Sequence, residues 1–121
     1  MVFYAYMKYT GSCQCGAVKY EVEADLASVM SCNCSRCGRL GWLMTFVPAS
    51  AFTLFSGEDD LTEYRFNKKL IAHLFCKICG IESFARGVGP DGSETVAVNV
   101  RCLEGVDPSM LTITPYNGKD Y

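Results

Sequence analysis

Two segments of the sequence alternate hydrophobic and polar residues with a period of two, the pattern of a half-buried β-strand. In segment 17–24, Val18, Tyr20 and Val22 fall on one face, and charged residues fall on the other. Segment 94–103 repeats the pattern, with apolar residues at every second position. Both segments are therefore predicted to be strands of a sheet with one buried face.

Shorter signals complete a mainly β pattern. A third strand is predicted over 61–66, and turns are predicted at 89–94 and 116–119, where Gly accompanies Asp or Asn. Segments 48–52 and 107–110 can each form a single helical turn, because a proline lies near the start of each. No stretch has sustained helical periodicity, so we expect one antiparallel β domain with short helical turns.

The length and charge of the chain narrow the class of protein. The 121 residues suffice for a single domain, residues 1–121, which would bury roughly two-thirds of its unfolded surface. The 11 basic and 13 acidic side chains give a net charge of -2, and lysines form no stripe. A nucleic acid is therefore not an expected partner. The sequence makes no prediction about the oligomeric state.

The apolar residues also predict the compartment. The first residues have no basic start and no small-residue cleavage site, and no apolar run reaches the roughly 18 residues of a membrane helix. We therefore expect a soluble, cytoplasmic protein without a membrane partner. In a reducing compartment, its eight cysteines are expected to be metal ligands or reactive thiols.

The spacing of the cysteines is the strongest chemical signal in the chain. Seven of the eight fall into three groups: Cys13 and Cys15; Cys32, Cys34 and Cys37; Cys76 and Cys79. In a C-x-C segment of extended chain, the two sulfurs point the same way. In the C-x-x-C segment, Gly80 allows the sharp turn that brings backbone N–H groups toward the sulfurs.

Counting ligands predicts two different metal sites. Structural zinc takes four tetrahedral ligands, which two cysteine pairs can supply. The pairs Cys13–Cys15 and Cys76–Cys79 meet that requirement. The loop with Cys32, Cys34 and Cys37 offers three thiolates and leaves a fourth position open, as in catalytic zinc sites.

Other roles for these cysteines remain open at this stage. The thiols could form disulfides, or all seven ligands could be structural, with Cys102 or His73 completing the second site. A histidine in an apolar strand is more often a hydrogen-bonded core residue, so His73 is not assigned to metal. Cys102 is either an inert buried thiol or a redox nucleophile.

Aromatic and basic residues surround the three-cysteine loop. Four aromatic residues follow it and could wall a pocket or belong to the core: Trp42, Phe46, Phe52 and Phe55. Arg36 and Arg39 could offset the negative charge of a three-thiolate zinc site or bind a substrate carboxylate. Alternatively, both are solvated loop residues.

The order of these motifs resembles the glutathione-dependent formaldehyde-activating enzyme family, which includes the centromere-protein-V-like proteins. The resemblance extends from about Thr10 to Gly118 and rests on "GSCQCGAVKYEVE", "CNCSRCGRLG", "HLFCKICG" and "VNVRCLEGVD". It implies a β-tent fold, a structural zinc on the four paired cysteines, and a second zinc on the three-cysteine loop. The family often has His where this chain has Gln14 and Asn33, and Arg or Gln where it has Gly38. These positions flank the expected open coordination position, so they bear on the choice of substrate.

The resemblance implies a zinc-dependent, carbon-sulfur lyase-like reaction, similar to that of S-(hydroxymethyl)glutathione synthase. A thiol such as glutathione would occupy the open position on the zinc of Cys32, Cys34 and Cys37 and attack formaldehyde or a related small aldehyde. Asn33 and Arg36 are the expected substrate-binding residues. The alternative function is a non-catalytic, zinc-stabilised module that binds a thiol or a protein.

Overall fold

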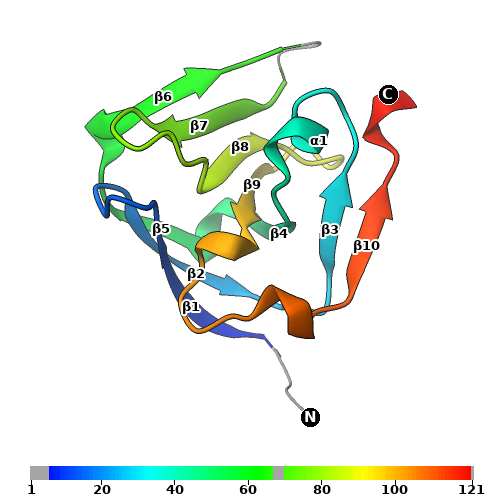
Figure 1. Cartoon of the computed structure of the whole chain (residues 1–121), viewed down its shortest axis with the longest axis horizontal. Helices are drawn as coiled ribbons and strands as arrows, with labels where there is room; N and C mark the ends of the chain where they lie inside the picture. Colours follow the sequence, from blue (N-terminus) through cyan, green and yellow to red (C-terminus); the bar gives the residue numbers. More distant parts are fainter. Residues whose placement is uncertain (1–5, 67–69, 121) are drawn as a thin grey trace.

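The computed structural model describes residues 6–66 and 70–120, which form two β-sheets linked by short turns (Figure 1). The smaller sheet has three antiparallel strands, in the order β1 (Met7–Ser12), β2 (Lys19–Ala24) and β5 (Phe52–Ser56). The strand predicted over 17–24 is confirmed as β2. Its side chains are buried at alternate positions, with Tyr20 and Val22 at 1% and 0% exposure.

The larger sheet carries most of the remaining chain. Its strands follow the order β10 (Ile113–Tyr116), β3 (Val29–Cys32), β4 (Met44–Pro48), β9 (Glu94–Asn99), β8 (Phe84–Val88), β7 (Ala72–Cys76) and β6 (Leu61–Tyr64). Neighbouring strands are antiparallel except β10 and β3, which are parallel. The mainly β prediction is confirmed, and this parallel pair brings the end of the chain beside the three-cysteine loop.

The two sheets face each other across an aromatic core. The rings of Tyr20 and Phe52 in the smaller sheet stack with centroids 5.1 Å apart. Phe84 of the larger sheet contacts both rings, at 5.9 Å from Tyr20 and 4.6 Å from Phe52. The Tyr20 hydroxyl donates a hydrogen bond to the carbonyl of Ser83, so its polar end is satisfied inside the core.

The opposite face of the larger sheet carries a second, smaller apolar cluster. It contains Ala85 of β8, Ala97 of β9 and Met44 of β4, together with Cys37 and Trp42. Strand β9 is therefore buried on both faces, which explains the run of buried residues from Val96 to Val100.

The ends of two predicted strands need correction. The strand predicted over 94–103 ends at Asn99, and Val100–Cys102 forms a 3-10 helix, η3. The chain turns here because the Asn99 side chain accepts a hydrogen bond from the N–H of Arg101. The strand predicted over 61–66 is β6, which ends at Tyr64.

Both predicted helical turns are confirmed as 3-10 helices. η1 (Ala49–Ala51) follows Pro48, and η4 (Pro108–Met110) begins at Pro108 after the capping residue Asp107. Further 3-10 turns are η2 (Glu58–Asp60) and η5 (Gly118–Asp120). These turns redirect the chain between strands without adding a helical layer.

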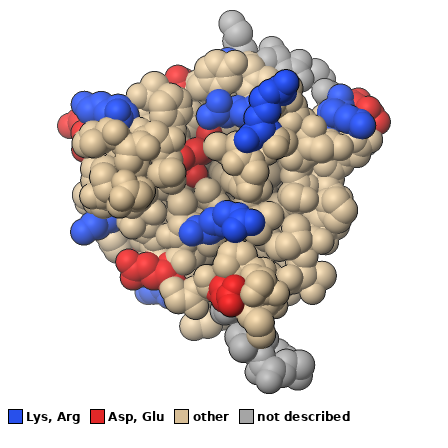
Figure 2. Space-filling model, viewed as in Figure 1, with Lys and Arg blue, Asp and Glu red and all other residues tan. Residues whose placement is uncertain are grey.

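The surface carries charges of both signs. On the face drawn in Figure 2, the Lys and Arg side chains of the described residues lie in separate small groups, several of them beside Asp or Glu. Among the described residues, no helix has the length and apolar character that crossing a membrane would require.

Candidate functional site

Four cysteine sulfurs meet where the first sheet adjoins strand β7. Cys13 and Cys15 follow β1, Cys76 is the last residue of β7, and Cys79 lies in the next turn. The sulfur of Cys15 lies 3.7 Å from that of Cys13 and 3.7 Å from that of Cys76. Four sulfurs at the usual zinc distance define a tetrahedron with edges of about 3.8 Å. The cluster therefore has the dimensions of a tetrahedral metal site.

Backbone N–H groups support this four-cysteine cluster. The turn after Cys76 is closed by a hydrogen bond from Gly80 N–H to the Cys76 carbonyl, at a positive φ of 80° that favours glycine. Burial alone would raise the pKa of the Cys79 thiol. Hydrogen bonds from the backbone N–H groups of Cys15 and Ile81 and from the neighbouring thiols outweigh burial and lower this pKa to about 6. These donors stabilise the thiolate, which is the form that binds metal.

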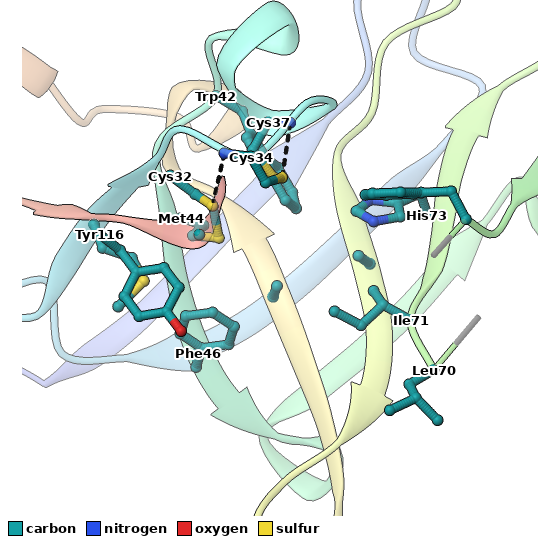
Figure 3. A pocket seen from close by; sticks show the side chains of 15 residues that line it. Cys32, Cys34, Cys37, Trp42, Met44, Phe46, Leu70, Ile71, His73 and Tyr116 are labelled. Carbon is teal, nitrogen blue, oxygen red and sulfur yellow. Dashed lines mark hydrogen bonds between the residues drawn. The ribbon is translucent and has the colours of Figure 1, made fainter. Parts of the chain in front are cut away.

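The three-cysteine loop joins strand β3 to a four-residue helix, α1 (Cys37–Leu40). Cys32 ends β3 and Cys37 begins α1, with Cys34 between them, and the three sulfurs lie within 4.8 Å of one another. The N–H of Cys34 donates to the Cys32 sulfur at 3.5 Å, and the N–H of Cys37 donates to the Cys34 sulfur at 3.3 Å (Figure 3). Helix α1 is capped at its C-terminus by Gly41, whose φ is 73°.

The thiols of this loop differ in acidity. Burial opposes ionisation of Cys34, but hydrogen bonds led by that from the Cys37 N–H lower the pKa of its thiol below the ordinary value. Burial raises the pKa of Cys37 to about 12. A metal ion binding here would have to displace a proton from Cys37, so metal affinity should fall as the pH falls.

The C-terminal segment covers one side of the loop. The N–H of Asn33 donates to the Tyr116 carbonyl at 3.2 Å. The Asn33 side chain donates to the Asn117 side chain at 2.8 Å and accepts from the N–H of Lys119 at 3.0 Å. Asn33 therefore joins the three-cysteine loop to the end of the chain.

The three sulfurs line a cavity of about 430 Å³ whose walls are mostly apolar. Figure 3 shows the cysteines on one side, with His73, Ile71 and Leu70 across from them. The cross-strand pair Ala85 and Ala97 also lines the cavity, and these small side chains leave space that larger residues would fill. All three residues of the three-cysteine cluster line this cavity, and none of the four residues of the other cluster does.

The aromatic residues predicted to wall a pocket divide between two locations. Trp42 and Phe46 line the cavity. Phe52 belongs to the core between the sheets, and Phe55 is 59% exposed and does not line the cavity. Eight further apolar or aromatic lining residues were missed from the sequence, because a local pattern does not distinguish a cavity wall from ordinary packing: Met30, Met44, Phe66, Leu70, Ile71, Ala85, Ala97 and Tyr116.

A buried carboxylate joins the loop to the far wall. Glu82 is 1% exposed at its side chain, and its Oε1 lies 2.7 Å from Nη2 of Arg36. Its other oxygen, Oε2, lies 3.1 Å from Nδ1 of His73. The guanidinium of Arg36 also lies over the Tyr64 ring, 4.9 Å from its centroid. Glu82 was missed from the sequence, because a glutamate in a short segment between a turn and a strand is usually exposed to solvent.

The two expected substrate-binding residues lie beside the site, with partners in the protein. Asn33 binds the C-terminal segment and Arg36 binds Glu82, and neither is among the described residues that line the cavity. Their role in substrate binding stays a prediction. Arg39 is exposed and donates to the Ser35 carbonyl at 2.8 Å.

The structure also bears on the other roles considered for the cysteines. None of the eight cysteines forms a disulfide. Neither Cys102 nor His73 joins the three-cysteine cluster among the described residues. His73 is buried and hydrogen-bonded, as expected for a histidine in an apolar strand, and it also lines the cavity.

Fold and site together define a class: small mainly β proteins whose cysteine clusters, one of four and one of three, could hold metal ions. The model of the family described as "Glutathione-dependent formaldehyde-activating enzyme" matches residues 8–114, and the chain belongs to this family. Among solved structures, the chain is similar to the crystal structure of a Rhodobacter sphaeroides protein from a structural genomics programme. The two share 35% sequence identity with a TM-score of 0.76, and the match covers 89% of this chain and 100% of that one.

Proposed function

We propose that the chain is a zinc-dependent enzyme that joins a small thiol to a small aldehyde and, in the reverse direction, cleaves the carbon–sulfur bond of the adduct. Glutathione and formaldehyde are the substrates that the family description suggests. The observation that carries the proposal is that all three residues of the incomplete cysteine set line an apolar cavity.

The donor sets support zinc in both sites. Thiolates are preferred zinc ligands, and the 3.7 Å sulfur separations of the first cluster suit tetrahedral coordination. In the proposal, Cys13, Cys15, Cys76 and Cys79 hold a structural zinc, and Cys32, Cys34 and Cys37 hold a catalytic one. A zinc ion with three protein ligands would supply Lewis acidity, which favours the ionised form of a substrate thiol at neutral pH.

The chain's own residues supply the place of reaction. The mostly apolar walls around Phe46 and Ile71 can hold an aldehyde beside the three-cysteine loop. The cavity would hold the thiol and the aldehyde next to each other, so the bimolecular reaction becomes effectively unimolecular. This proximity is the main source of rate acceleration in the proposal, because the reaction also proceeds without a catalyst.

The proposal is tested by measuring exchange between free formaldehyde and its glutathione adduct by NMR, with and without the zinc-loaded protein. Acceleration by the intact protein and its loss in Cys34→Ser would support an enzyme. Protection of the site by glutathione without any acceleration would instead identify a thiol-binding module and overturn the catalytic proposal. A larger aldehyde, tested in parallel, would show whether the cavity accepts substituents.

A further inference from the structure

His73 lies on the cavity wall across from the three cysteines (Figure 3). It is the chain's one histidine, and its side chain is 4% exposed. The rings of Trp42 and Phe66 pack near it, with centroids at 6.3 and 5.4 Å. These neighbouring rings restrict the rotation of the imidazole in its buried position.

One of these nitrogens is already occupied. Nδ1 lies 3.1 Å from Oε2 of Glu82, whose Oε1 is paired with Arg36 at 2.7 Å. The guanidinium of Arg36 is only a hydrogen-bond donor, so Oε1 of Glu82 accepts its hydrogen bond, as an oxygen of a carboxylate does. Since a carboxylate only accepts hydrogen bonds, Nδ1 must carry the proton that joins it to Glu82.

This assignment determines the chemistry of the other nitrogen. When the imidazole is neutral with its proton on Nδ1, Nε2 has a free lone pair and can accept a proton. Among the described residues, none forms a hydrogen bond with Nε2. The nitrogen left for a ligand in the cavity is therefore a base, oriented by a buried carboxylate as in hydrolase triads.

We propose that His73 is a catalytic residue that takes the proton of the substrate thiol and delivers it to the aldehyde oxygen, with Glu82 and Arg36 as positioning residues. The inference rests on the proposed function and supplies its proton path. First, the S–H bond breaks and the proton moves to Nε2. The sulfur electron pair then forms the C–S bond, and the C=O π pair moves to oxygen. That oxygen takes the proton from Nε2, so the hydroxyl adduct forms and His73 is regenerated without net redox change.

A purely structural role accounts less well for this arrangement. Burying an ion pair costs desolvation free energy, and apolar replacements of buried pairs are often neutral or stabilising. Here the buried Glu82 contacts Arg36 through one oxygen and His73 through the other, and His73 is a titratable ring that lines the cavity. Among residues 6–66 and 70–120, the other titratable groups facing that cavity are Tyr116 and the three cysteines.

The first test needs no substitution. In zinc-loaded protein labelled with ¹⁵N-histidine and free of any histidine tag, every imidazole signal comes from His73. We expect Nδ1 protonated and Nε2 unprotonated in the free protein near neutral pH, and both protonated once glutathione is bound. A free protein with the proton on Nε2 would overturn the proposal, whether or not the protein is an enzyme.

The second test counts protons by calorimetry of glutathione binding in buffers of different ionisation enthalpy. The intact protein should release almost no proton, because His73 takes it up, whereas His73→Gln should release about one per thiol bound. Release of one proton by both would overturn the role of His73 while leaving the proposed function intact. Release of none by both would show that the thiol does not bind as a thiolate, which overturns both.

Kinetics complete the test. His73→Gln should lower kcat by about 100-fold or more, the usual contribution of a general acid–base group. Glu82→Gln should lower kcat less and weaken the preference for a proton on Nδ1 in the NMR spectrum. Arg65→Gln, which removes the exposed ion pair with Glu63, is the control and should match the intact protein. Full activity of a folded His73→Gln variant would overturn the proposal.

Discussion

Gly118 lies against Cys32 so closely that a Cβ on this glycine would overlap the Cys32 sulfur. The same Cβ would lie 3.3 Å from the Cβ of Cys34, which is closer than most such contacts. The end of the chain can therefore pack on the three-cysteine loop only because residue 118 has no side chain. Strand β10 pairs in parallel with β3, the strand that ends at Cys32, so the chain reaches this point directly after β10.

The substitution Gly118→Ala should damage the three-cysteine site and spare the rest of the fold. The added methyl must displace either the Cys32 sulfur or the C-terminal segment, so we expect zinc to fall from about two ions per chain to about one. Metal analysis of purified protein together with circular dichroism would measure this. Gly87→Ala is the matched control, because its Cβ would meet only ordinary contacts, the nearest at 3.5 Å. Retention of both ions by Gly118→Ala would contradict the prediction.

Serine substitutions in the two clusters should have different consequences. A structural zinc contributes about 10–16 kcal/mol, which matches or exceeds the usual 5–15 kcal/mol stability of a domain. Cys76→Ser, at a fully buried cysteine of the proposed structural zinc site, should therefore prevent folding. Cys34→Ser should leave a folded, inactive protein with one zinc fewer. Thermal unfolding and metal content distinguish the two, and equal unfolding of both variants would refute the division into structural and catalytic sites.

The grouping of the cysteines could be predicted from sequence because ligand spacing is local. Each C-x-C or C-x-x-C motif brings its own sulfurs together, and only one long-range meeting, between the segments around Cys13 and Cys76, remained to be found. The arrangement around Glu82 could not be predicted in this way. It requires strand β7, the turn before β8 and the loop before α1 to converge, and no sequence periodicity records that convergence.

The cavity could not be predicted from the sequence either. In the sequence, Ala85 and Ala97 have the pattern of ordinary strand residues. Only their pairing across β8 and β9 shows that two small side chains lie next to each other. The strand ending at Asn99 was predicted too long because the alternation of apolar residues continues into η3. There the side chain of Asn99 accepts a hydrogen bond from the N–H of Arg101, and this local hydrogen bond turns the chain although the apolar alternation continues.

Asn33→Ala tests whether this residue positions the C-terminal segment or binds substrate. The variant loses the hydrogen bonds to Asn117 and to the N–H of Lys119, each with a net contribution of about 0.5–1.5 kcal/mol. We expect faster amide hydrogen exchange at residues 113–120 and an almost unchanged KM for glutathione. Asn117→Ala removes one of the same bonds and should shift exchange in the same direction. A large rise in KM with unchanged exchange would instead support direct substrate binding by Asn33.

Cys102 should behave as a poorly reactive thiol. Burial raises its pKa above the ordinary thiol value of about 8.5, so its thiolate fraction at neutral pH is smaller than that of a free cysteine. Because the thiolate is the reactive form, iodoacetamide should modify Cys102 slowly at pH 7. The rate should keep rising beyond about pH 9.5, one unit above the ordinary thiol pKa, where a free cysteine levels off. Mass spectrometry of the zinc-loaded protein would measure the modification, with free cysteine as the reference for reagent reactivity. Cys102→Ala should retain both metals and full activity. Rapid alkylation at pH 7, combined with loss of activity in a metal-replete Cys102→Ala variant, would show that Cys102 is a nucleophile in the reaction.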